Sequence, residues 1–122
     1  MILIVDDDPI VHLLYKRHLV QAGFELLSAK NGVEALALAE QTKPDLILMD
    51  VMMPEKDGFA TLREFKKREA TCNVPVIIMT ANVAQYETCR HESARGGADG
   101  LLTKPLSPAK LVSEVQRFFP RP

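Results

Sequence analysis

The chain has 122 residues, of which 47% are hydrophobic and 25% are charged, and this composition predicts a single globular domain over residues 1–122. A formal net charge of −1 argues against nucleic acid or an anionic membrane as the main partner. No apolar stretch has the length of a membrane span, and the apolar N-terminus is too short for a signal peptide. The 2 cysteines match no metal-binding spacing, so we expect free thiols and a cytoplasmic location.

Apolar runs alternate with helical patterns along the first half of the chain. Residues 2–5 predict a buried strand, and the Asp6-Asp7-Asp8-Pro9 sequence predicts a capped helix that ends at Gly23. Residues 24–29 predict a weaker edge strand, and a second helix is expected from residue 31 to about residue 41. The first helix carries one apolar stripe that we expect to face the core, formed by Val11, Leu14, His18, Leu19 and Ala22.

The second half of the chain continues this alternation. Residues 45–49 predict a strand that runs into Asp50, and a helix is expected over about residues 58–68. Residues 74–80 and 100–103 predict two further strands, separated by a helix over about residues 83–95, and Ser107-Pro108 begins a last helix. Strict alternation predicts an α/β fold, a doubly wound five-stranded parallel sheet of order 2-1-3-4-5 with five helices on both faces.

Polar residues that could carry chemistry stand where the predicted strands end. Asp6 and Asp7 close the first strand and Asp50 closes the third. Thr80 closes the fourth strand, and Lys104 follows the fifth. The carboxyl ends of parallel strands meet at one edge of a doubly wound sheet, so these side chains should lie close together. Bare carboxylates at such distances repel one another, and a hard divalent cation such as Mg²⁺ resolves that conflict.

Each of these residues also has a purely structural explanation when it is taken alone. Residues 6–8 could be an acidic helix cap, and Asp50 could be a turn residue at a strand end. Thr80 could reflect strand propensity, and Lys104-Pro105 could be an exposed turn. The joint pattern at successive strand ends favours a functional site.

Together these residues resemble one protein family. The whole chain is similar to the receiver domain of two-component response regulators, which is CheY-like and has a flavodoxin-like fold. The resemblance rests on the motifs Val5-Asp6-Asp7, Met49-Asp50-Val51-Met52-Met53-Pro54 with Asp57-Gly58, Thr80-Ala81, and Lys104-Pro105.

The resemblance implies a phosphoacceptor that catalyses only its own phosphorylation and dephosphorylation, and not an enzyme with a separate substrate. Asp50 would be the nucleophile that takes a phosphoryl group from the phosphohistidine of a sensor histidine kinase or a histidine phosphotransfer protein. Asp7 would bind Mg²⁺ directly and Asp6 partly through water. Asp50 and the backbone carbonyl of Met52 would complete the protein ligands.

The resemblance also implies a conformational switch. Lys104 would place a positive charge on the phosphoryl oxygens, and Thr80 would hydrogen-bond them and move toward the site. A cis peptide between Lys104 and Pro105, common in this family, would aim the lysine inward. Leu101 stands where the family usually has an aromatic switch residue, and the stretch from Thr80 to Lys104 is longer than the usual spacing. The switch here would therefore not use an aromatic side chain.

The expected partners are the phosphodonor and a downstream output domain or target protein, with no direct nucleic acid or membrane contact. The signalling face would comprise the helix over about residues 83–95, the strand over residues 100–103 and the last helix. This face would also carry any dimerisation of a domain that is a monomer or a weak dimer.

Three other functions compete with this interpretation. A receiver that signals by binding alone, without phosphate, usually lacks one of the acids or the lysine, and here none is missing. A phosphohydrolase of the haloacid dehalogenase type also uses Asp, Thr, Lys and an acid pair, but its nucleophile follows the first strand, the reverse of the order found here. A flavodoxin-like FMN protein would need phosphate-cradling loops in place of the acids.

Overall fold

The computed structural model describes residues 1–50, 58–80, 95, 97–103 and 107–119. A five-stranded parallel sheet has the order β2-β1-β3-β4-β5, which confirms the predicted topology. Its strands are β1 (Ile2–Val5), β2 (Leu26–Ala29), β3 (Leu46–Asp50), β4 (Val76–Thr80) and β5 (Gly100–Thr103). The helices among the described residues are α1 (Pro9–Gln21), α2 (Gly32–Gln41), α3 (Gly58–Lys67) and α5 (Pro108–Gln116). The helix expected over about residues 83–95 lies almost wholly outside the described residues.

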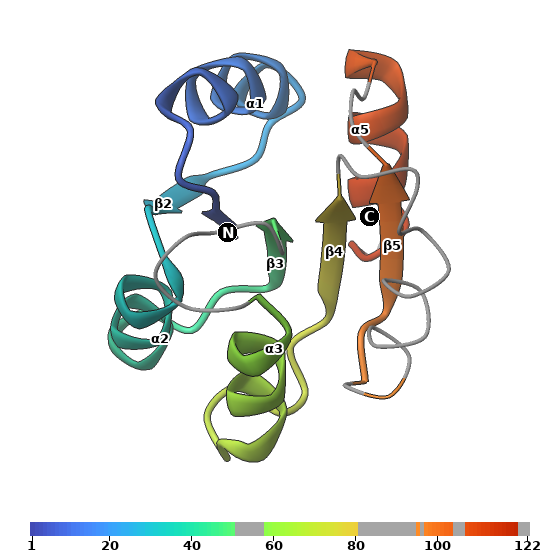
Figure 1. Ribbon diagram of the computed structural model, residues 1–122. Coiled ribbons are helices and arrows are strands. Elements are labelled where there is room, and N and C mark those ends of the chain that lie inside the picture. Colours follow the sequence, from blue (N-terminus) through green and yellow to red (C-terminus); the bar gives the residue numbers. More distant parts are fainter. Residues whose placement is uncertain (51–57, 81–94, 96, 104–106, 120–122) are drawn as a thin grey trace.

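Helices cover both faces of the sheet (Figure 1). α1 and α5 pack on one face, and α2 and α3 pack on the other. The central strands β1, β3 and β4 are buried along their whole length, as expected for parallel strands that are covered on both faces. β2 lies at an edge and is partly exposed, as its composition predicted. The three central strands therefore approach solvent only near their ends, where the acidic residues stand.

The packed face of α1 differs from the predicted stripe at Leu14 and Ala22. Leu19 is fully buried as predicted, but the second buried residue of the helix is Tyr15, whereas Leu14 is 47% exposed. Ala22 is also exposed, because it lies in the turn that ends the helix. Tyr15 and Leu19 stand four residues apart on one face of the helix and belong to the same hydrophobic cluster, and a tyrosine ring buries a large apolar area. The expectation that Leu14 and Ala22 face the core was wrong.

Polar contacts around Asp99 hold the start of β5 against β4. The Asp99 N–H donates to the Val76 carbonyl at 2.8 Å, and the Asp99 carboxylate accepts from the Val76 N–H at 2.9 Å. Lys66 Nζ, in the last turn of α3, donates to the same carboxylate at 3.1 Å and to the Val74 carbonyl at 3.0 Å. These bonds fix the register of β4 and β5, and with it the positions at which both strands end.

Gly32 is the first residue of α2 and packs against Thr61 of α3. A Cβ atom at Gly32 would overlap the hydroxyl of the buried Thr61 and lie 3.2 Å from the Thr61 Cβ. We therefore expect Gly32→Ala to lower the free energy of unfolding by about 1–3 kcal/mol, as overpacking of a filled interior does. Urea denaturation followed by circular dichroism measures this change.

Val33 supplies the matched control, because it is the next residue of the same helix and its side chain is 63% exposed. Val33→Ala should change the free energy of unfolding by less than about 0.5 kcal/mol. In a Thr61→Ala background the cost of Gly32→Ala should fall, because the overlapping hydroxyl is gone. An equal cost in both backgrounds would contradict a clash with Thr61.

Candidate functional site

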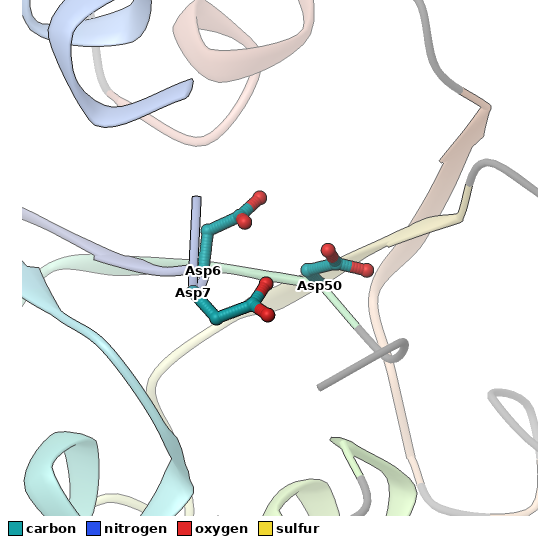
Figure 2. A group of neighbouring side chains, drawn as sticks. All are labelled: Asp6, Asp7 and Asp50. Carbon is teal, nitrogen blue, oxygen red and sulfur yellow. The ribbon is translucent and has the colours of Figure 1, made fainter. Parts of the chain in front are cut away.

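The three aspartates predicted at strand ends lie together. β1 and β3 are adjacent, and their register pairs Val5 with Met49. The next residues along the two strands, Asp6 and Asp50, therefore reach the same level of the sheet, and Asp7 follows in the loop that leads into α1. Carboxylate oxygens of all three residues lie within 4.8 Å of one another, and Figure 2 shows the group. The expected gathering of acids at one edge of the sheet is present.

Burial of these like charges is energetically costly. Asp6 is fully buried and Asp50 is 6% exposed, whereas Asp7 is exposed. At such separations two unit charges of the same sign repel by roughly 3–4 kcal/mol if the effective dielectric constant is about 20. A cation among the carboxylates replaces this repulsion with attraction. The geometry therefore favours a bound cation.

The donor set of the cluster suits Mg²⁺. Its ligand atoms are carboxylate oxygens alone, which are the hard ligands that Mg²⁺ prefers. Asp7 borders a cavity of about 460 Å³, so there is space on that side for the water ligands that Mg²⁺ retains. The described residues that line this cavity are Asp7, Pro9, His12, Ser28, Lys30 and Glu34.

Asp6 is held by contacts from an adjacent strand, the loop and a helix. Its N–H donates to the Ala29 carbonyl at 3.1 Å, and its Oδ1 accepts from the Asp8 N–H at 3.0 Å. His12 Nε2 donates to the Asp6 carbonyl oxygen at 2.6 Å. The His12 side chain is half-buried, and it was not singled out from the sequence. The only signal in the sequence was its position in the early turns of the helix that follows the acid pair.

Thr80 ends β4 one residue beyond the level of Asp50. The register of β3 and β4 pairs Asp50 with Met79, and Thr80 is the next residue. The Thr80 side chain is fully buried, and on its other side it pairs with Thr103, the last residue of β5. The sequence-predicted site residues that lie outside the described part of the chain are Met52, Lys104 and Pro105.

Leu101 lies on the same face of the sheet as Thr80. It pairs with Ile78, which stands two residues before Thr80, and strand side chains alternate between faces. Leu101 is half-buried and packs against the hydrophobic cluster that the sheet forms with α2 and α3. Thr80 and Leu101 are therefore diagonal neighbours on adjacent strands.

Comparison with known proteins agrees with this geometry. Residues 2–116 match the family described as the response regulator receiver domain. The chain belongs to this family. Protein PilH of Pseudomonas aeruginosa is 40% identical over 93% of this chain and 93% of its own length. The chemotaxis protein CheY4 of Vibrio cholerae has a solved structure that is 30% identical, with a TM-score of 0.89 and 97% of each chain covered.

Other relatives are longer than this receiver domain. The DNA-binding dual master transcriptional regulator RpaA of Synechocystis is 36% identical over 98% of this chain and 49% of its own length. The phosphate regulon transcriptional regulatory protein PhoB of Pseudomonas aeruginosa is 38% identical over 98% of this chain and 52% of its own length. The chain thus spans about half the length of these two relatives. Among the described residues, no helix has the length and apolar character that crossing a membrane requires.

Membership of the family defines the general function. A response regulator receiver domain takes part in two-component signalling as a phosphoacceptor switch, and it interacts with histidine kinases and output domains. Receiver domains bind Mg²⁺ at an acidic pocket. In this chain the three carboxylates of Asp6, Asp7 and Asp50 form an acidic cluster that could hold the ion.

Proposed function

We propose that this receiver domain accepts a phosphoryl group on Asp50 from the phosphohistidine of a sensor histidine kinase or a histidine phosphotransfer protein. The observation that carries the proposal is the cluster of carboxylates whose oxygens lie within 4.8 Å of one another. Asp50 ends β3, which lies between β1 and β4 in the middle of the sheet. Residues 1–122 act as one receiver unit in this proposal, and the unit turns over no separate substrate.

Asp50 is the nucleophile of the proposed transfer. One of its carboxylate oxygens attacks phosphorus while the phosphorus–nitrogen bond of the phosphohistidine breaks, and the departing imidazole nitrogen keeps the electron pair and takes up a proton. Asp7 binds Mg²⁺ directly, Asp6 binds it partly through water, and the Met52 carbonyl is a further ligand beside Asp50. When bound, Mg²⁺ neutralises charge that develops on the phosphoryl oxygens.

Thr80, Lys104 and Leu101 connect the phosphoryl group to the rest of the molecule. Lys104 contributes a positive charge to the phosphoryl oxygens, and the Thr80 hydroxyl donates a hydrogen bond to them. Movement of Thr80 toward the site frees space on the face that it shares with Leu101, and Leu101 shifts to fill it. Because Leu101 has no ring, this switch transmits the signal through aliphatic packing.

The proposed partners are the phosphodonor and a downstream output domain or target protein. Relatives such as RpaA, of whose length the chain covers 49%, are named as transcriptional regulators. A DNA-binding segment separate from the receiver would be consistent with these names. A net charge of −1 gives the receiver itself little attraction for nucleic acid. We propose that the receiver is a monomer or a weak dimer, and that its signalling face includes β5 and α5.

Intact mass spectrometry after incubation with acetyl phosphate tests this proposal. We expect one phosphoryl increment when Mg²⁺ is present and none when EDTA removes it, because the clustered carboxylates repel the anionic donor without a cation. Circular dichroism of the same samples establishes that the protein is folded. If the folded protein with Mg²⁺ takes up no phosphoryl group, the proposal is wrong, and a receiver that signals by binding alone is favoured.

A further inference from the structure

His12 ties helix α1 to the backbone of the acidic loop. Its Nε2 lies 2.6 Å from the carbonyl oxygen of Asp6. Because a carbonyl oxygen can only accept, Nε2 is the ring nitrogen that carries a proton. The carbonyl belongs to the peptide unit that joins Asp6 to Asp7. The hydrogen bond therefore restrains rotation of the peptide between the two acids.

Asp7 depends on this restraint more than Asp6 does. Asp6 is fully buried, and its Oδ1 also accepts the Asp8 N–H. Asp7 is exposed, and its carboxylate has no hydrogen bond or ion pair to another described residue. The direction in which the Asp7 side chain leaves the main chain is set by its backbone, and His12 holds the peptide that precedes it.

The position of His12 is energetically unfavourable apart from this bond. Its Nδ1 is buried and has no hydrogen-bond partner among the described residues. A buried polar atom without a partner destabilises the folded state, and a leucine of similar size would avoid that penalty. A buried polar group without a protein partner calls for an explanation, such as a bridging water or a role in a site. The bond from Nε2 to the acidic loop supplies one.

We propose that His12 is a positioning residue that orients the Asp7 carboxylate toward the other two carboxylates and thereby raises the affinity for Mg²⁺. This inference rests on the proposed metal site. A loop that is already held in its binding geometry loses less conformational freedom when the ion binds. Groups that orient a metal ligand without touching the metal have large effects on metal affinity for this reason.

Isothermal titration calorimetry with Mg²⁺ on three variants tests the inference. His12→Leu removes the donor while retaining a side chain of similar volume, and we expect roughly tenfold weaker Mg²⁺ binding. His12→Gln can place an amide N–H near the position of Nε2, and it should restore the affinity to within about twofold of wild type. His18→Leu makes the same change at a half-buried position in the last turn of α1, and it should leave the affinity unchanged.

A measurement without Mg²⁺ reports on the backbone directly. The amide resonance of Asp7 in the metal-free protein should shift in His12→Leu and return toward its wild-type position in His12→Gln. Equal Mg²⁺ affinities for wild type and His12→Leu would overturn the role of His12 and leave the metal site intact. A loss in His12→Leu that His12→Gln does not restore would overturn the hydrogen bond as its cause. Absence of Mg²⁺ binding in the wild type would overturn the metal site and the inference together.

Discussion

We expect Asp50→Asn to abolish phosphoryl incorporation from acetyl phosphate in the presence of Mg²⁺, with a rate lower by at least about a thousandfold. The amide has nearly the same size as the carboxylate, but it is a far poorer nucleophile and carries no negative charge. The substitution also removes one of the three clustered charges, so the folded state should be retained. The time course of intact mass in the presence of acetyl phosphate measures the rate.

Asp45 provides a matched control for this prediction. It immediately precedes β3, at the opposite end of the strand from Asp50, and its side chain is 65% exposed. Asp45→Asn therefore removes the same charge next to the other end of the strand and should leave phosphoryl incorporation unchanged. Incorporation at the wild-type rate in Asp50→Asn would contradict Asp50 as the acceptor. Peptide mapping would then locate the acceptor, with Asp6 and Asp7 as the first candidates because of their proximity.

We expect the second large effect from Asp7→Asn. Relative to wild type, this variant should be more stable without Mg²⁺ and less stable with it. Without Mg²⁺ the variant should be more stable than wild type by about 1 kcal/mol, because it loses repulsion that solvent partly screens at this exposed position. With Mg²⁺ at about 100 times its Kd, the wild type gains about 2.7 kcal/mol, and the variant should gain little of this. Thermal unfolding followed by circular dichroism should show the order of stability reversing.

Asp8 is the matched control for Asp7. It is the next residue, and it caps α1 by accepting a hydrogen bond from the Ile10 N–H at 2.9 Å. Asparagine caps a helix as well as aspartate does, so Asp8→Asn removes a charge from the same loop without removing the cap. This variant should keep the full stabilisation by Mg²⁺. Full Mg²⁺ stabilisation in Asp7→Asn, or its loss in Asp8→Asn, would contradict Asp7 as a ligand.

The strand order and the acidic edge could be predicted because they depend on local pattern. The runs that became β1, β3 and β4 contain almost no polar residues before their last position, and only strands buried on both faces accept such a composition. Alternation with helices then leaves few topologies, since crossovers between parallel strands are right-handed. Asp6 follows β1 and Asp50 ends β3. These two strands are neighbours in that topology, so the proximity of the two aspartates could be predicted.

The packing of α1 could not be predicted in the same way. Leu14 and Tyr15 are consecutive and lie about 100° apart around the helix axis, so a smaller rotation of the helix decides which of them is buried. The structure buries Tyr15 and exposes Leu14. The same rotation determines where His12 lies, because it stands three residues before Tyr15 on the helix. A pattern of apolar residues constrains this rotation only loosely when both candidates are large.

The sequence by itself determined which residues reach the carboxyl edge of the sheet, because strand composition and βα alternation specify the topology in which Asp6, Asp7, Asp50 and Thr80 stand together. Only the tertiary structure decided how that edge is held. The bond from His12 to the Asp6 carbonyl joins a helix to a loop, and it depends on the rotation of α1 against the sheet and on the rotamer of the histidine. The local sequence pattern predicts neither the helix rotation nor the rotamer, because both result from packing against residues distant in the chain.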